Sequence, residues 1–129
     1  MDKEAVRAAL QHYFDYSPTD EDKAHEIYQQ DAVLEFPQSG ERFEGVDNFR
    51  EWRRMYPAKV GFDIRRVRGE GDTWVVELLL RYDDGPRKYG VDILLFRDGK
   101  VARETVYSMD GWEAPAWRAQ WAAPPGDQQ

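Results

Sequence analysis

The stretch Thr73-Trp74-Val75-Val76-Glu77-Leu78-Leu79-Leu80-Arg81-Tyr82-Asp83 decides the fold, because large apolar residues recur in it at every second position. A period of two is typical of a β-strand that buries one face. Residues 60–68, 87–97 and 100–107 show the same period, and short segments that contain glycine separate them. We therefore predict four consecutive strands in an antiparallel meander. The face that must be covered carries Trp74, Val76, Leu78, Leu80 and Tyr82.

Upstream of the meander, apolar residues recur at helical spacing. Residues 2–16 are predicted as a helix that ends at Ser17-Pro18, because proline disfavours helical geometry in the residue before it. Thr19 or Asp20 can cap a second helix that reaches about Gln30. The sequence thus begins with two helices before the first strand.

A hairpin and a third helix connect this region to the meander. Residues 33–37 alternate like a strand, Ser39-Gly40 forms a turn, and residues 41–44 return as a short second strand. Asp47 can cap a third helix that continues to about Tyr56. The order of elements therefore places three helices on one side of a sheet.

This order predicts an α+β fold, with three N-terminal helices packed on a curved, mainly antiparallel sheet of about six strands. A strongly curved sheet holds its helices away at one end, so the two layers form a cone with a ligand cavity. At 129 residues, the chain is long enough for one domain with its own core, which we expect over residues 1–123. Residues 124–129 are expected to form a loose tail.

Charge and composition exclude several classes of function. The net charge of −7 repels a phosphate backbone, so no nucleic-acid partner is expected. No apolar run reaches the ~20 residues that cross a bilayer, so no membrane partner is expected, and the absence of cysteine fits a cytoplasmic protein. With two distant histidines and no cysteine, no metal site is predicted. No phosphate loop or dinucleotide fingerprint indicates a cofactor.

Three further stretches carry a resemblance to a known family. Residues 28–37 look like a helix-to-strand entry, residues 40–45 like a glycine-ended hairpin, and residues 96–101 like the turn into a last strand. With the order of elements, they resemble the nuclear-transport-factor-like superfamily, in particular its SnoaL-like branch, over about residues 4–122. Residues 115–121 are similar to the tail of an uncharacterised bacterial subgroup. The resemblance implies a cystatin-like cone, but one such fold hosts many chemistries.

The catalytic residues of two enzymes in this superfamily carry over only in part. Ketosteroid isomerase places its carboxylate base just before a proline on the first strand, where this chain has Phe36. Its helix-one tyrosine maps to His12 by ungapped counting or to Tyr13 after a shift of one, and its oxyanion acid maps to Asp92. Limonene epoxide hydrolase places its catalytic aspartate at the position of Val106. Because phenylalanine and valine cannot take a proton, the resemblance implies neither reaction unchanged.

Asp92, Glu104 and Tyr13 are the candidate catalytic residues, since SnoaL-type cyclases need a proton donor and an acceptor. Asp92 interrupts an apolar strand. It lies two residues before Leu94 and four before Phe96, so the three side chains should point to the same face, which would direct the Asp92 carboxyl group into the cone. The alternative is that Val91, Ile93 and Leu95 face the core and Asp92 faces water. Glu104 could supply a second carboxylate or form a cross-strand ion pair with an arginine. The Tyr13 hydroxyl could contact a ligand or form a structural hydrogen bond.

Aromatic and apolar residues from several elements are the expected ligand-binding lining, although ordinary core packing would place the same residues inside. His25 follows Glu21 by four residues, a spacing that suits a surface or rim pair. The predicted lining residues are Tyr28, Phe36, Trp52, Tyr56, Trp74 and Val106.

The C-terminus carries Trp112, Trp117 and Trp121, which need burial either under their own sheet or against a partner subunit. Members of the resembled superfamily commonly pair through the open face of the sheet, so the resemblance implies a homodimer. Under the parity that turns Asp92 inward, the open face carries Val75, Leu79, Val91, Ile93 and Leu95.

Three functions follow as hypotheses. The first is a small-molecule-binding domain with an apolar, aromatic-lined pocket and no assigned reaction. The second is an acid–base enzyme of the cyclase, isomerase or hydratase type, acting on a hydrophobic cyclic substrate with Asp92 and Glu104 as acid and base. The third is a protein–protein module, which would leave a large apolar patch exposed after dimerisation.

Overall fold

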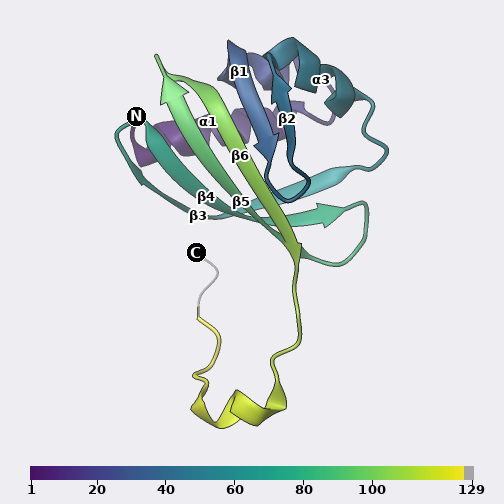
Figure 1. The fold of residues 1–129 in the computed structure, drawn as a ribbon, viewed down its shortest axis with the longest axis vertical. Coiled ribbons are helices and arrows are strands. Elements are labelled where there is room, and N and C mark those ends of the chain that lie inside the picture. The colour runs from purple at the N-terminus through teal and green to yellow at the C-terminus, as the bar shows by residue number, and fades with distance from the viewer. Residues whose placement is uncertain (127–129) are drawn as a thin grey trace.

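Six strands form one sheet in the order β2-β1-β6-β5-β4-β3, and three helices lie on one side of it (Figure 1). The structure is a computed structural model that describes residues 1–126. Strand β1 runs parallel to β6, and every other neighbouring pair is antiparallel. The predicted α+β fold is confirmed. The elements are α1 Lys3–Tyr16, α2 Glu21–Ala24, the 3-10 helix η1 His25–Ile27, β1 Tyr28–Phe36, β2 Glu41–Glu44, α3 Val46–Arg54, β3 Val60–Glu70, β4 Thr73–Tyr82, β5 Lys88–Arg97, β6 Lys100–Asp110 and the 3-10 helix η2 Ala116–Trp121.

The first helix forms where the sequence predicts it. Asp2 caps α1, and its side chain accepts a hydrogen bond from the backbone N–H of Ala5 at 2.8 Å. Val6 and Leu10 are buried on the side that faces the sheet. The next residues turn the chain into α2, which Asp20 caps by accepting from the N–H of Lys23.

The second helix is much shorter than predicted, and its expected end at Gln30 is wrong. Regular α-helix stops at Ala24, and strand β1 already begins at Tyr28. Tyr28 pairs with Val101 of β6, and its side chain is buried against the sheet. Pairing with the last strand therefore overrides the local helical pattern of Ala24, Ile27 and Tyr28.

The third helix starts two residues earlier than predicted, and Asp47 does not cap it. The N-cap is Gly45, which adopts a positive φ of 88° that favours glycine. Asp47 lies in the first turn, where its carboxylate accepts a hydrogen bond from Arg50. Phe49 is fully buried and fixes α3 against the sheet.

In the four strands of the meander, every second side chain points into the space under the helices. Trp74, Val76, Leu78 and Leu80 of β4 are buried, as the period of two predicts. On β5, Asp92, Leu94 and Phe96 are buried, whereas Ile93 and Leu95 are exposed. The inverted parity, with Asp92 facing water, is therefore wrong. We call the buried side of the sheet the inner face and the other side the outer face.

The chain leaves the sheet after Asp110, and residues 111–126 extend away from it (Figure 1). We call this segment the C-terminal arm. It contains η2, and nearly all of its residues are exposed. Of the expected loose tail at 124–129, residues 127–129 lie outside the described residues. Within residues 1–126, no helix is both long enough and apolar enough to span a membrane.

Candidate functional site

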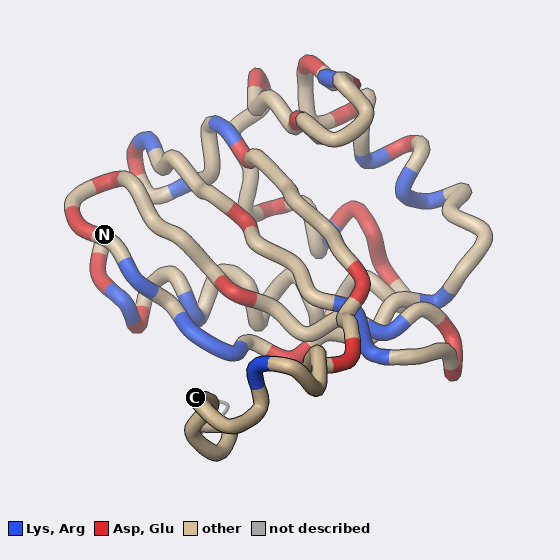
Figure 2. The backbone as a smooth tube through the Cα atoms, turned by 60° about the horizontal axis from the view of Figure 1, so that its bottom comes forward, with Lys and Arg blue, Asp and Glu red and all other residues tan. Residues whose placement is uncertain are grey.

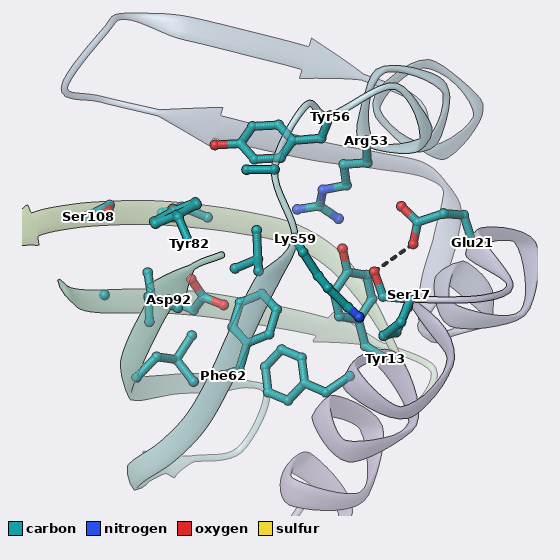
Figure 3. Close-up of a pocket in the computed structure, with 18 of the residues that line it drawn as sticks. Tyr13, Ser17, Glu21, Arg53, Tyr56, Lys59, Phe62, Tyr82, Asp92 and Ser108 are labelled. Carbon is teal, nitrogen blue, oxygen red and sulfur yellow. Dashed lines mark hydrogen bonds between the residues drawn. The ribbon is translucent and has the colours of Figure 1, made fainter. Parts of the chain in front are cut away.

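A cavity of about 580 Å³ lies between the helices and the inner face of the sheet (Figure 3). Part of its wall is apolar: the rings of Phe14 and Phe62 stack with centroids 4.1 Å apart, and Trp52 and Leu80 also line it. Polar side chains, among them Lys59 and Ser108, also border the cavity. Arg53 and Asp92 enter from opposite sides and point toward the same interior (Figure 3). An apolar cavity with a few convergent polar groups is the usual form of a small-molecule site.

Arg53 of α3 is the centre of a buried polar cluster. Its Nη1 donates to the hydroxyl of Tyr28 at 3.1 Å, and Nη2 lies 3.8 Å from Oε1 of Glu104. Tyr28 in turn donates to the same Glu104 oxygen at 2.5 Å. The cluster thus holds Glu104 with a charge and a hydroxyl, which is the pairing that a buried carboxylate requires.

His25 belongs to this cluster, and its interpretation as a surface or rim pair with Glu21 is wrong. Its Nδ1 lies 2.7 Å from the backbone carbonyl oxygen of Glu21, and its Nε2 lies 3.2 Å from Nη1 of Arg53. Because Arg53 can only donate, Nε2 accepts and the proton resides on Nδ1. Burial and the charge of Arg53 lower the pKa of His25 to about 4, so the ring is neutral near pH 7.

Asp92 and Glu104 are brought together on the inner face. Leu94 pairs with Glu104 and Asp92 pairs with Val106 across β5 and β6, so the two carboxyl groups are diagonal neighbours. Both side chains are buried and both line the cavity. Burial first, and the negative charge of Glu104 second, raise the pKa of Asp92 well above its usual value. This shift favours the neutral, protonated form of the Asp92 carboxyl group.

Tyr13 of α1 closes one side of the cluster. Its ring meets that of His25 edge-on with centroids 5.3 Å apart, and the Arg53 guanidinium lies 5.3 Å from its centroid. Burial raises the pKa of its hydroxyl, which keeps that group a neutral donor. Ser17 lies at the same end of the cavity and donates to Glu21 at 2.7 Å (Figure 3).

Five of the six residues expected in the ligand-binding lining border the cavity, and Trp74 does not. Trp74 is buried, but its indole N–H donates to the carbonyl oxygen of Gly71 at 2.9 Å, beside the β3–β4 turn. Its parity was predicted correctly, but the cavity lies at the other end of β4, near Leu80 and Tyr82. The residues that do border it are Tyr28, Phe36, Trp52, Tyr56 and Val106.

Arg53 was not among the predicted site residues, although the sequence carries a signal for it. Arg53 follows the buried Phe49 by four residues, which places both on the same side of a helix. An arginine at an inward position of an amphipathic helix indicates a buried partner, and Glu104 is that partner. Among residues 1–126, no cluster of His, Asp or Glu side chains could hold a metal ion.

The comparison with known families agrees with this architecture. Residues 6–104 match the family of SnoaL-like domains. The chain belongs to this family. The matched segment of the SnoaL-like domain runs from α1 to β6 and includes both Asp92 and Glu104, whereas the C-terminal arm lies beyond it. No protein with a curated description matches the sequence.

Solved structures with this fold come from several bacteria. An NTF-2 like protein of unknown function from Burkholderia xenovorans is 43% identical to this SnoaL-like domain, with a TM-score of 0.85 and coverage of 96% of this chain and 98% of that chain. A candidate ketosteroid isomerase from Kribbella flavida is 26% identical, with a TM-score of 0.79 and coverage of 96% and 92%. A candidate polyketide cyclase from Sinorhizobium meliloti is 22% identical, with a TM-score of 0.67 and coverage of 80% and 98%, and shows the fold alone.

Proposed function

We propose that this SnoaL-like domain binds a small, hydrophobic and uncharged molecule that carries a hydrogen-bonding oxygen. The observation that supports this function best is the cavity of about 580 Å³, whose apolar walls end at a polar cluster with balanced charges. Arg53 is paired with Glu104, and burial raises the pKa of Asp92, which favours its neutral form. A charged ligand would add an unpaired charge to this buried cluster, which is costly. A neutral ligand avoids that cost.

The test compares two probes of nearly equal shape: 2-acetylnaphthalene, a neutral ketone, and 2-naphthoate, an anion near pH 7. Binding is followed by NMR shifts of backbone amides in titrations of the full chain. We expect the ketone to perturb residues on the inner face and to bind at least tenfold more tightly than the anion, a difference of about 1.4 kcal/mol. Equal binding of both probes, or shifts confined to the outer face, would contradict the proposal.

Two variants localise this binding. Val106→Trp places an indole inside the cavity, because Val106 lines it. Tyr107→Trp adds an indole at the next position of β6, whose side chain points to the other face of the sheet. We expect the first variant to lose affinity for the ketone and the second to keep it. If both variants bind equally well, the ligand site lies elsewhere.

Proton transfer on the bound molecule is a second candidate function, favoured by two carboxyl groups on the cavity wall, Glu104 and Asp92, of which Asp92 has a raised pKa. On an enolisable ketone, the Glu104 carboxylate takes a proton from the carbon next to the carbonyl group. The released electron pair forms the carbon–carbon double bond of the enol, and the carbonyl oxygen takes the proton of Asp92. The pair then holds one proton, as before, on the other carboxyl group. The similarity to the candidate ketosteroid isomerase structure, at 26% identity, is consistent with such chemistry.

Deuterium exchange tests this second function without knowledge of the natural substrate. The probe is 2-tetralone in D₂O, and NMR follows exchange of its α-protons. We expect exchange above the buffer rate, and a loss of ~10²-fold or more in Asp92→Asn and Glu104→Gln, since a positioned acid or base contributes this much. Glu35→Gln, on the outer face, is the control and should exchange at the original rate. Exchange at the buffer rate in the original chain would leave binding as the function.

A further inference from the structure

A second groove continues the cavity at one of its ends. It has a volume of about 400 Å³ and shares Tyr56, Tyr82 and Ser108 with the cavity. We call these three residues the junction. They lie at the end of the cavity opposite to Tyr13 and Ser17 (Figure 3). The cavity and the groove therefore meet at the junction, and a ligand whose ring system fills the cavity can extend into the groove.

The far end of the groove is formed by an ion pair between Lys88 and Asp110. These residues pair across β5 and β6, two positions beyond the pair of Gly90 and Ser108. Because side chains two residues apart point to the same face, Lys88 belongs to the same inner row of β5 as Asp92. Four residues of a strand span about 13 Å, so a ligand that contacts both Asp92 and Lys88 must be elongated.

The hydroxyl groups of the junction are free to bind a ligand. The side-chain amide of Gln38 holds both the backbone N–H and the backbone carbonyl oxygen of Ser108. The rings of Tyr56 and Tyr82 contact each other with centroids 6.2 Å apart. Within residues 1–126, the three hydroxyl groups form no hydrogen bond to another residue. Each hydroxyl can both donate to a bound molecule and accept from it.

The groove offers donors and acceptors of balanced charge. Lys88 donates and Asp110 accepts. Figure 2 shows acidic and basic residues close together along the chain around the end of β6. A charged ligand group would meet one residue of its own sign, and the net charge of −7 also repels anions. A neutral group with several hydroxyls avoids both costs and can bind Lys88 and Asp110 at once.

We propose that this groove is a subsite for a neutral sugar, so that the ligand of this SnoaL-like domain is a glycoside with its ring system in the cavity. The inference rests on the proposed function, because it needs that ring system to occupy the cavity. Tyr56 and Tyr82 each present an apolar ring and a polar tip. The rings pack on the C–H face of the sugar, and the sugar hydroxyls bind the junction, Lys88 and Asp110.

The test compares 6-hydroxy-2-acetylnaphthalene with its 6-O-β-D-glucoside in NMR titrations of the full chain. Both probes carry the ketone for the cavity, and only the glucoside carries a sugar. A second glucoside has an ethylene glycol spacer between the rings and the sugar. We expect at least one glucoside to bind about tenfold more tightly than the hydroxy ketone, equivalent to roughly one net hydrogen bond. It should also shift the backbone amides of Lys88 and Asp110.

The outcomes separate this subsite from the proposed function. If the hydroxy ketone binds in the cavity and neither glucoside binds more tightly, the sugar subsite is wrong and the proposed function stands. If the hydroxy ketone does not bind at all, the proposed function is contradicted, and the glycoside inference is lost with it.

Two further probes test the neutrality of the subsite. They replace the sugar by an oxyacetate group, which is an anion near pH 7, or by an aminoethyl ether, which is a cation. We expect both to bind more weakly than the better glucoside, because each meets a like charge in the ion pair of Lys88 and Asp110. A charged probe that binds more tightly than both glucosides would overturn the assignment to a sugar.

Two lysine variants locate the sugar. Lys88→Met removes a donor of the groove, and the ratio between the affinities of glucoside and hydroxy ketone should fall toward one. Lys100→Met is the matched control, because Lys100 lies at the other end of the β5–β6 hairpin, and it should keep the original ratio. If Lys88→Met keeps the same ratio as Lys100→Met, the sugar does not lie in this groove and the proposal is wrong.

Discussion

Two glutamates on neighbouring strands have the same kinds of partners and face opposite sides of the sheet. Glu104 on the inner face accepts from the Tyr28 hydroxyl at 2.5 Å and has Arg53 at 3.8 Å. Glu35 on the outer face accepts from the Thr105 hydroxyl at 2.7 Å and has Arg103 at 3.2 Å. The inner side chains of Glu104 and Arg53 are 7% and 14% exposed, and the outer ones of Glu35 and Arg103 are 28% and 43% exposed.

The comparison teaches that solvent access, rather than the choice of partners, separates the two sites. Water screens the outer pair and can replace either partner. The inner pair has no such replacement, so each member depends on the other. The pKa values of two carboxyl groups show the same contrast. On the inner face, burial and the charge of Glu104 raise the pKa of Asp92. On the outer face, the hydrogen bond from Thr105 and the contact with Arg103 lower the pKa of Glu35.

The largest expected effect is the loss of the inner arginine. Arg53→Met should lower the free energy of unfolding by about 3–5 kcal/mol, because it leaves Glu104 as an uncompensated buried charge and removes the donor to Tyr28. Urea denaturation at pH 7 measures this. The double variant Arg53→Met, Glu104→Gln should recover part of the loss. A cost below about 1 kcal/mol would mean that the inner pair is as well hydrated as a surface pair.

The second prediction concerns acid. His25 has a pKa of about 4 in the folded chain and about 6.5 when unfolded, so the unfolded state binds more protons between these values. Stability should therefore fall as the pH drops from 6.5 to 4, by up to about 3 kcal/mol from this residue. Denaturation curves across this range measure the effect, and His25→Gln should flatten it. An imidazole NMR signal of His25 that titrates near 6.5 in the folded chain would contradict the prediction.

Asp92 should give a pH dependence of the opposite sign. Its folded pKa is raised, so the folded state binds more protons than the unfolded one above the unfolded pKa of about 3.9. The stabilisation is complete below that value and is lost as the pH rises toward the folded pKa, by about 1.4 kcal/mol per pH unit. Asp92→Asn should remove this slope in urea titrations.

Glu35→Gln should instead remove stability that is present above pH ~4.5 and lost below it, because the pKa of Glu35 is lowered.

The smallest effect is expected at the outer arginine. Arg103→Met should change the free energy of unfolding by less than about 1 kcal/mol at pH 7, since water and Thr105 still solvate Glu35. This variant is the matched control for Arg53→Met, and 0.5 M salt should reduce its effect further. A loss as large as that of Arg53→Met would mean that partners, and not solvent access, set the energy of these sites.

The sequence predicts the parity of the strands well, because parity follows from alternation alone. Val76, Leu78 and Asp92 therefore lie on the expected face. The position of a residue along its strand is harder to predict, as Trp74 shows. The place where helices separate from a sheet depends on long-range packing, and on β4 the cavity begins at Leu78.

The polar cluster around Arg53 was not predicted, for a related reason. Arg53, His25 and Tyr28 come from three different elements, and each looks like a surface or core residue when taken alone. Glu104, the common partner of Arg53 and Tyr28, lies on the last strand, far away in sequence. No local pattern encodes such a pairing. The predicted second helix was too long for the same reason, since Tyr28 pairs with Val101 of the distant strand β6.

Because β1 pairs with β6, the sheet cannot be completed until the end of the chain has been synthesised. On the ribosome, α3 and β1 are complete long before the strand that carries Glu104 is made. At ~5–20 residues per second, roughly 3 to 10 seconds pass between the synthesis of Arg53 and that of Glu104. During this interval the guanidinium has no carboxylate partner from β6, so it must remain hydrated. Enclosure of the cavity is therefore among the last events of folding, and it waits for the final strand to be translated.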